Sequence, residues 1–244
     1  MNEVLGVDIG GTGIKAAPVD TDTGELLAKR KRIKTPHPAT PDAVVDVVEE
    51  LVDHFSWEGP IGIGIPAVVR QGVTLTASNL DKKWIGFDAG KAMTKALGRS
   101  VSLLNDADAA GLAEVAFGAA KGVEGTVVVV TLGTGIGSAV FADGRLLTNT
   151  ELGHLKIDGV PAEDLASAKV KEDDDLSWKK WGKRLDEFLD ELDRLLWPEL
   201  FIIGGGISDE FDHYCKRLDL HAAVTPAEMR NEAGIVGAAL ATQR

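Results

Sequence analysis

The sequence predicts an α/β protein built from two similar halves, on three observations. Apolar strand-like segments alternate with segments whose apolar residues recur at helical spacing. A glycine turn occurs twice, because Gly-Thr-Gly-Ile occupies Gly11–Ile14 and again Gly133–Ile136, 122 residues later. Each copy lies between two apolar strands, which predicts a hairpin at the start of each half.

Composition excludes several classes of protein. The chain has 244 residues, a net charge of −12 and one cysteine. It has no apolar run near the roughly 18 residues that a membrane span needs, and no basic leader precedes its first strand. A single Cys215 excludes an internal disulfide framework and a multi-cysteine metal site. We therefore expect a cytoplasmic protein that binds neither membranes nor nucleic acid, since nucleic acid calls for a broad basic surface.

The first half alternates strands and helices. Thr40 and Pro41 are typical of a helix cap and first turn, and an i, i+3, i+4 apolar stripe follows them as far as Phe55. A second helix is expected at 88–97. Strands are expected at 4–8, 14–19, 26–33, 61–65 and 101–104.

The second half repeats the pattern. Strands are expected at 126–132, 136–142, 200–203 and 221–224, and helices at 106–120, 176–197, 209–218 and 232–242. The charged segment 169–176 is expected to be a mobile loop. We place the lobe boundary between residues 104 and 105, giving lobes 1–104 and 105–231, with the C-terminal helix at about 232–244 packing back on the first lobe.

The first glycine turn predicts a phosphate site. Asp8 ends the strand before it, where a carboxylate can hold Mg²⁺ or its water shell. Backbone amides of Gly10–Gly13 and the Thr12 hydroxyl suit an anion, and Lys15 adds a positive charge. The segment matches neither the Walker loop nor a dinucleotide fingerprint, because a strand follows Ile14. An ordinary hairpin turn is the alternative.

Two glycine segments in the second half suit the same ligand. The second turn supplies Thr131, Gly133, Thr134 and Gly135. Gly204, Gly205 and Gly206 separate a strand from a helix start, where free amides attract anions and a flat backbone admits a purine ring. A purely structural strand-to-helix turn is the alternative.

Asn105 and Asp106 lie where a strand passes into a helix. A carboxylate there can accept the proton of a hydroxyl that attacks phosphorus, as an aspartate does in other kinases. The alternative is that Asp106 only caps the helix.

Glu151 and His154 lie three residues apart after the second hairpin, and Glu163 follows. With Asn105 and Asp106 they can form the paired hydrogen bonds that vicinal sugar hydroxyls need. A structural histidine and a metal ligand are alternatives, and the lack of neighbouring cysteines weakens the second.

Two further segments carry positive charge. SNLDKKWIG at 78–86 is interpreted as an exposed loop in which Asn79 is a candidate sugar ligand and Lys82 and Lys83 are candidate phosphate ligands. Lys29–Arg32 with Lys34 fits either a solvated edge strand or a track for a polyanion. A solvated loop is the alternative for the first segment.

Eight motifs in order resemble the ROK family of sugar kinases. They are DIGGTGIK, GIPAVV, SNLDKKWIG, LNDADAAGLAE, TLGTGIGSA, TELGH, FIIGGGIS and GIVGAA, and they span essentially the whole chain. SNLDKKWIG and the short length are most similar to the polyphosphate glucokinases of that family.

The resemblance implies two ribonuclease-H-like lobes of the actin/hexokinase superfamily with a cleft between them. It implies Asp106 as the general base for the glucose 6-hydroxyl and Asn79, Asn105, Glu151, His154 and Glu163 as sugar ligands. It further implies that the two glycine turns bind polyphosphate or ATP with Mg²⁺ near Asp8, that Gly204–Gly206 line a nucleotide site, and that the protein is a homodimer.

The chain departs from the family at one point. Many ROK proteins carry a cysteine-rich zinc loop after the Gly-His, whereas residues 156–164 here have no cysteine, so no structural zinc is expected. Ser167 follows Glu163 at the spacing of the family's Glu-x-x-x-Ser, which keeps the sugar role of Glu163. Alternatives are an ATP-only glucokinase, an N-acylhexosamine kinase, a non-catalytic sugar sensor and an actin-like filament protein.

Overall fold

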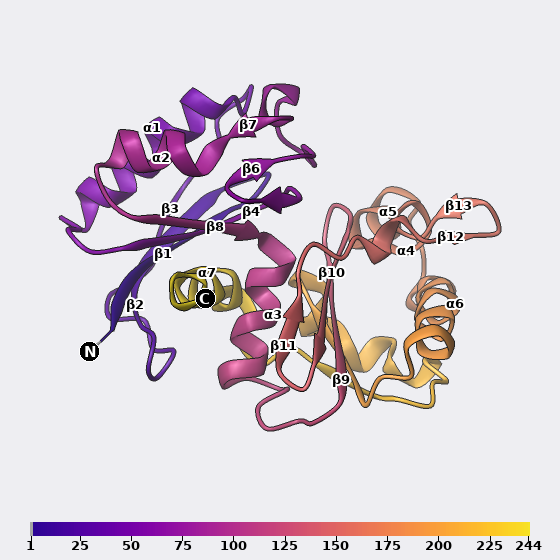
Figure 1. The fold of residues 1–244 in the computed structure, drawn as a ribbon. Coiled ribbons are helices and arrows are strands. Elements are labelled where there is room, and N and C mark those ends of the chain that lie inside the picture. The colour runs from indigo at the N-terminus through magenta and orange to yellow at the C-terminus, as the bar shows by residue number, and fades with distance from the viewer. Residues whose placement is uncertain (1) are drawn as a thin grey trace. The chain divides into compact units, whose positions relative to one another are not determined.

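The computed structural model describes residues 2–244, which divide into two compact units (Figure 1). Unit 1 contains the described residues up to Ala113 together with Glu232–Arg244, and unit 2 is Glu114–Asn231. Within the described residues, no helix combines the length and the apolar character that crossing a membrane requires.

Unit 1 is built on a five-stranded sheet of order β3-β2-β1-β4-β8. β1 and β2 form the antiparallel hairpin around the first glycine turn, while β4 and β8 run parallel to β1. The strands are β1 (Glu3–Ile9), β2 (Ile14–Asp20), β3 (Lys31–Ile33), β4 (Ile61–Ile65) and β8 (Val101–Asn105).

Helices cover both faces of this sheet (Figure 1). α1 (Pro41–His54) and α2 (Ala89–Leu97) lie on one face, and the Thr40 hydroxyl caps α1 by accepting from the Ala43 amide. α7 (Ala233–Leu240) packs on β1 and β4 on the other face. Its backbone approaches so closely that a Cβ at Gly6 would collide with the Ile235 carbonyl, so glycine is required there.

A small sheet of β5 (Val69–Arg70), β6 (Val73–Thr74) and β7 (Phe87–Asp88) follows β4. The 3-10 helix η1 (Lys82–Trp84) precedes β7. Trp84 is fully buried, and its indole donates to the Ala39 carbonyl at 2.9 Å. The segment expected to be an exposed loop is therefore anchored in the core by its tryptophan.

Unit 2 repeats the strand order of unit 1 as β11-β10-β9-β14-β15. β9 and β10 form the hairpin around the second glycine turn, and β14 and β15 extend the sheet in parallel. The strands are β9 (Thr126–Leu132), β10 (Ile136–Ala142), β11 (Arg145–Leu147), β14 (Leu200–Gly204) and β15 (Ala223–Pro226).

α6 (Trp178–Leu196) supplies most of the helical part of the unit 2 core through Trp181, Leu185, Phe188, Leu189 and Leu192. α3 (Asp106–Phe117) begins in unit 1 and ends in unit 2. Smaller elements are η2 (Leu152–His154), β12 (Lys156–Ile157), β13 (Val160–Pro161), α4 (Glu163–Ala166), α5 (Ala168–Asp173), η3 (Gly206–His213), η4 (Cys215–Arg217), η5 (Arg230–Glu232) and η6 (Ala241–Gln243).

Three sequence-based expectations differ from the structure. Residues 169–176 were expected to be a mobile loop, but most of them form α5, whose N-cap Ser167 accepts from the Val170 amide. The helix expected at 209–218 is two 3-10 helices, η3 and η4. The strand expected at 26–33 pairs continuously only as β3, with an isolated bridge from Leu26 to Val19.

Candidate active site

The first glycine turn is held by an ion pair and a buried hydroxyl. Lys15 Nζ lies 3.2 Å from Asp8 Oδ2, since the two residues are opposite each other in the β1–β2 hairpin. Thr35 Oγ1 donates to the Gly10 carbonyl at 2.5 Å. Asp8 also packs against Gly234 at the start of α7, where a Cβ would lie 2.8 Å from its carboxyl carbon.

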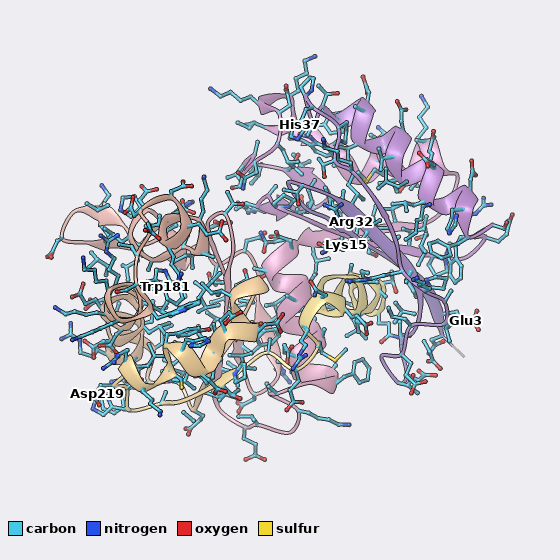
Figure 2. The ribbon with its side chains drawn as sticks, turned by 180° about the vertical axis from the view of Figure 1, so that it is seen from behind. Glu3, Lys15, Arg32, His37, Trp181 and Asp219 are labelled. Atoms are coloured by element: carbon cyan, nitrogen blue, oxygen red, sulfur yellow. The ribbon has the colours of Figure 1, made fainter. Side chains whose placement is uncertain are left out.

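Two further side chains flank this turn. Arg32 on β3 lies opposite Lys15, and Nη2 of Arg32 donates to the Thr12 carbonyl at 2.8 Å (Figure 2). In the segment between β6 and η1, the Cβ of Asn79 lies 3.4 Å from the position that a Cβ on Gly11 would take. Asn79 has a positive φ of 59°. The structure therefore brings the predicted sugar ligand Asn79 next to the first turn.

Asn105, rather than Asp106, supplies the helix cap at the start of α3. Asn105 Oδ1 accepts from the amides of Ala107 at 2.9 Å and Asp108 at 3.1 Å, and its Nδ2 donates to the Ala67 carbonyl. Asp106 is the first residue of α3, with Oδ1 2.9 Å from the Ala107 nitrogen. Its carboxylate thus lies at the N-terminal, positive end of the α3 dipole.

Unit 2 gathers the second glycine turn and the acidic cluster. His154 Nε2 lies 3.3 Å from Glu163 Oε1, and His154 Nδ1 lies 4.0 Å from Glu151 Oε2. A Cβ at Gly135 would collide with Glu163 Oε2, so Glu163 lies directly on the turn. The three predicted sugar ligands of this unit therefore lie together, beside predicted donor ligands.

Burial raises the pKa of Glu151 above its ordinary value of 4.5. His154 opposes that shift, while the charge of Glu163 adds to it. Carboxyl groups with a raised pKa are common at buried positions and in ligand-binding sites.

A cavity of about 590 Å³ opens beside the second turn, within unit 2. Gly133 and Thr134 line one side and Gly206 and Ile207 another. α5 and α6 contribute Ala168, Lys169, Lys171, Glu172 and Trp178. Leu132 of β9 and Glu210 of η3 complete the lining. Gly205, next to this lining, has a φ of 85°, and a Cβ there would collide with the Leu132 carbonyl.

The Trp178 ring forms part of the wall of this cavity and is held by other aromatic side chains. Trp178 stacks on His213 and Tyr214 at centroid distances of 5.4 and 5.9 Å. Lys171 Nζ lies 4.0 Å from the centroid of the Trp178 ring. The lining therefore combines an aromatic ring, on which a purine can stack, with two lysines and the two glutamates Glu172 and Glu210.

Lys82 and Lys83 are exposed on η1 of unit 1, on the segment that also carries Asn79. The Asp81 carboxylate caps this short helix by accepting from the Lys83 amide at 2.9 Å. Both lysines therefore lie on a capped 3-10 helix in the same unit as the first glycine turn.

The fit to a divalent metal depends on Asp8. Among residues 2–244, no three His, Cys, Asp or Glu side chains gather as a metal-binding cluster. Mg²⁺ is usually held by one or two carboxylates plus substrate phosphates and waters, so a single carboxylate beside a phosphate turn fits it.

Sequence reasoning missed several residues of these sites. Thr35, Trp178 and Lys171 carry no motif, and they reach the sites through tertiary packing. In the sequence, Arg32 is distinguished only as a member of a basic run. Its position opposite Lys15 depends on the register of β2 against β3, which the sequence alone does not reveal. The Ser167 hydroxyl caps α5, and the Ser167 amide donates to the Glu163 carbonyl at 3.3 Å.

Comparisons with known proteins agree on one family. The model of the ROK family matches residues 4–173. The chain is 49% identical over 239 residues to the polyphosphate glucokinase of Mycobacterium tuberculosis, covering 98% of this chain and 90% of that protein.

Two solved structures are similar over almost their whole length. The inorganic polyphosphate/ATP-glucomannokinase from Arthrobacter sp. strain KM is 48% identical with a TM-score of 0.95, covering 99% of each chain. A ROK family glucokinase from Streptomyces griseus, in complex with glucose and AMPPNP, is 26% identical with a TM-score of 0.86, covering 99% of this chain and 100% of that one.

The predicted fold class is confirmed, because both units have the ribonuclease-H-like sheet of the actin/hexokinase superfamily. The predicted resemblance is confirmed as well. The family model covers well over half of the chain, and relatives near 49% identity span almost all of it. The chain therefore belongs to the ROK family.

Proposed function

We propose that this protein transfers the terminal phosphoryl group of inorganic polyphosphate to the 6-hydroxyl of glucose, giving glucose 6-phosphate. The observation that carries the proposal is the 45–49% identity, over 98% of this chain, to polyphosphate glucokinases of two mycobacteria. The two glycine turns, each next to charged side chains, are consistent with a phosphorylated donor.

ATP is proposed as a second donor. A specific observation favours it, namely the cavity of about 590 Å³ beside the second turn, with Trp178 on its wall. That volume accommodates a nucleoside, and Gly206 at its edge would let a base approach the backbone. Gly204, the last residue of β14, and Gly205 precede Gly206 at the start of η3 and are proposed to line the same nucleotide site.

Asp106 is proposed as the general base. As the glucose 6-oxygen forms its bond to the terminal phosphorus, Asp106 takes the hydroxyl proton. The bond between that phosphorus and the bridging oxygen breaks, and a polyphosphate one unit shorter leaves. Most of the rate enhancement in such transfers comes from positioning and from charge stabilisation.

The sugar is proposed to bind through Asn79, Asn105, Glu151, His154 and Glu163. Carboxylate and imidazole groups that already contact each other, as in the His154–Glu163 pair at 3.3 Å, have fixed orientations. Such preorganised acceptors bind vicinal hydroxyls at a lower entropic cost. The Asn105 amide has one N–H engaged by Ala67, and its second N–H can serve the sugar.

The donor is proposed to bind through the two turns, with Lys15 as a positive charge and Lys82 and Lys83 along a polyphosphate chain. Mg²⁺ is proposed as the cofactor, held at Asp8 through water or directly. When bound, it would neutralise charge on the donor phosphates. Asp8 itself orients Lys15, whose ammonium lies 3.2 Å away.

A cytoplasmic homodimer is proposed. The single cysteine suits a reducing compartment. Trp197 and Leu195, at the end of α6, are 68% and 61% exposed, which is unusual for large apolar side chains on one short segment. A second copy of the chain would cover them, and the molecular mass in solution tests this.

The test of the function is a comparison of donors. Purified, nucleotide-free protein is given glucose, Mg²⁺ and either polyphosphate or ATP, and glucose 6-phosphate is measured. Activity with polyphosphate supports the proposal, and activity with ATP alone would return the protein to an ATP-only glucokinase. Phosphorylation of N-acylhexosamines in preference to glucose would favour that alternative, and glucose binding without turnover would favour a sugar sensor.

A further inference from the structure

We propose that Arg32 binds a phosphate group of the donor at the first glycine turn, as the principal cation of that turn. The inference deepens the proposed function and rests on it for the identity of the donor. It selects one residue from the basic run at 29–34, and it assigns Lys31 no part in the site.

The strand register places Arg32 on the site side of the sheet. Asp8 is opposite Lys15 across β1 and β2, and Lys15 is opposite Arg32 across β2 and β3. Residues directly opposite each other in antiparallel strands share a face. Asp8, Lys15 and Arg32 therefore form one row across three strands, on the face where Asp8 meets Gly234 of α7. Figure 2 shows Lys15 and Arg32 side by side.

The neighbouring cation is on the other face. Lys31 is opposite Ala16, which is fully buried in the core cluster of unit 1. Successive residues of a strand point to opposite faces. Lys31 therefore provides a control of the same charge, one residue away from Arg32 and directed away from the turn.

The charges in the row are not equivalent. The Lys15 ammonium is paired with the Asp8 carboxylate at 3.2 Å, so part of its field is already neutralised. Within residues 2–244, no carboxylate forms an ion pair with Arg32, whose guanidinium donates from Nη2 to Thr12 alone. The second N–H of Nη2 can thus donate together with the adjacent Nε–H or Nη1 N–H to two phosphate oxygens, the fork geometry that arginine favours.

Gly13 leaves the space in which this guanidinium lies. A Cβ on Gly13 would fall within 2.6 Å of three guanidinium atoms of Arg32, namely Nε, Cζ and Nη2. The φ of Gly13 is not in the positive region, so its backbone does not require glycine. A side chain at position 13 would therefore displace this guanidinium from its place beside the turn.

The test compares Arg32→Gln with Lys31→Gln. Because a hydrogen bond to a charged group is worth about 1.5–3 kcal/mol, Arg32→Gln is expected to raise the KM for polyphosphate about 10- to 100-fold. Lys31→Gln is expected to stay within about twofold, since it removes the same charge from the opposite face. The Kd for glucose and the melting temperature are expected to be unchanged in both variants.

Arg32→Lys separates the fork from the charge. It retains the positive charge but not the paired donors, so its KM is expected to lie between those of wild type and Arg32→Gln. Gly13→Ala would displace the guanidinium, and its loss is therefore expected not to add to that of Arg32→Gln in the double variant. Equal effects of Arg32→Gln and Lys31→Gln, or fully additive losses in the Gly13–Arg32 cycle, would overturn the proposal.

A binding measurement keeps this test independent of the reaction. Titration calorimetry with inorganic tripolyphosphate, without glucose, is expected to show weaker binding to Arg32→Gln and unchanged binding to Lys31→Gln. If the wild type binds tripolyphosphate in this Arg32-dependent way but forms no glucose 6-phosphate, the proposed function fails while the anion site stands. If the wild type is active and Arg32→Gln keeps wild-type affinity, the anion site fails alone.

Discussion

His154 Nε2 lies 3.3 Å from Glu163 Oε1, and Glu163 in turn lies on Gly135 of the second glycine turn. The imidazole also approaches Glu151, with 4.0 Å between Nδ1 and Oε2. This chain of contacts joins the proposed sugar ligands of unit 2 to the proposed donor turn. A change at either carboxylate is therefore expected to affect the orientation of His154 as well as its own hydrogen bonds.

The first prediction concerns pH and Glu151. Because burial raises its pKa, Glu151 takes up a proton at a higher pH than an ordinary glutamate does. Protonation removes hydrogen-bond acceptor capacity. The KM for glucose is therefore expected to rise as the pH falls through this raised pKa, in a profile measured from pH 8 downwards. Glu151→Gln should have a higher KM at pH 8 and lack this limb, and an unchanged limb would assign it to another group.

The same shift makes a prediction about stability. The folded state binds the Glu151 proton more tightly than the unfolded chain does, so ionised Glu151 costs stability as the pH rises through its raised pKa. Glu151→Gln is expected to melt at a higher temperature than wild type at pH 8, with a smaller difference near pH 4. A lower melting temperature for the variant at pH 8 would contradict the burial argument.

The second prediction concerns Asp106. Removal of a general base typically reduces the rate by about 10²- to 10⁴-fold. Asp106→Asn is expected to lose kcat by this amount and to keep the wild-type Kd for glucose, measured by calorimetry. Asp42→Asn, in the first turn of α1, is a matched control and should keep full activity. An Asp106→Asn variant with most of its kcat would remove the residue from the reaction.

The third prediction concerns the lysines of η1. Lys82 and Lys83 are exposed on the segment that carries Asn79 next to the first turn. Replacing both by glutamine is expected to raise the KM for long-chain polyphosphate several times more than the KM for ATP, because only the long chain extends past the turn. The double variant Lys91→Gln, Lys95→Gln on α2 changes the net charge equally and should affect neither. Equal effects of the η1 variant on both donors would count against a track.

The fourth prediction concerns stability in unit 2. Glu114 is 1% exposed and accepts from the amides of Ala119, Glu228 and Met229 at 2.9, 3.2 and 2.8 Å. Glu114→Ala leaves these partly buried amide donors without their acceptor and is expected to lower the free energy of unfolding by about 3 kcal/mol. The exposed Glu124→Ala should change it by no more than about 0.5 kcal/mol. Denaturant unfolding with both variants tests this, and equal stabilities would contradict it.

Local patterns predicted the main elements well. Strands β4, β9 and β10 have the predicted bounds, and Thr40 and Pro41 begin α1 as their residue types indicate. These elements are specified by residues close in sequence, namely apolar runs, glycine turns and caps. The repeated hairpin likewise predicted that the second half would repeat the first, and both sheets have the same strand order.

Features that depend on tertiary contacts could not be predicted in this way. The acidic and basic residues of 169–176 suggested a loop, but Ser167 caps them as α5, Lys169 pairs with Asp173 at 2.6 Å, and Lys171 lies over Trp178. The indole of Trp84 is satisfied by Ala39, 45 residues away. The sequence does not show that Arg32 and Lys31 lie on opposite faces of the sheet relative to the first glycine turn, because that depends on the register of β3 against β2.

The most direct test of the proposed phosphoryl transfer is the product that the purified protein forms from glucose and polyphosphate with Mg²⁺. We expect glucose 6-phosphate to form in a one-to-one ratio with the phosphate units lost from the chain, and almost none to form with Asp106→Asn. Release of inorganic phosphate without any glucose 6-phosphate, from a protein that still binds glucose, would contradict it.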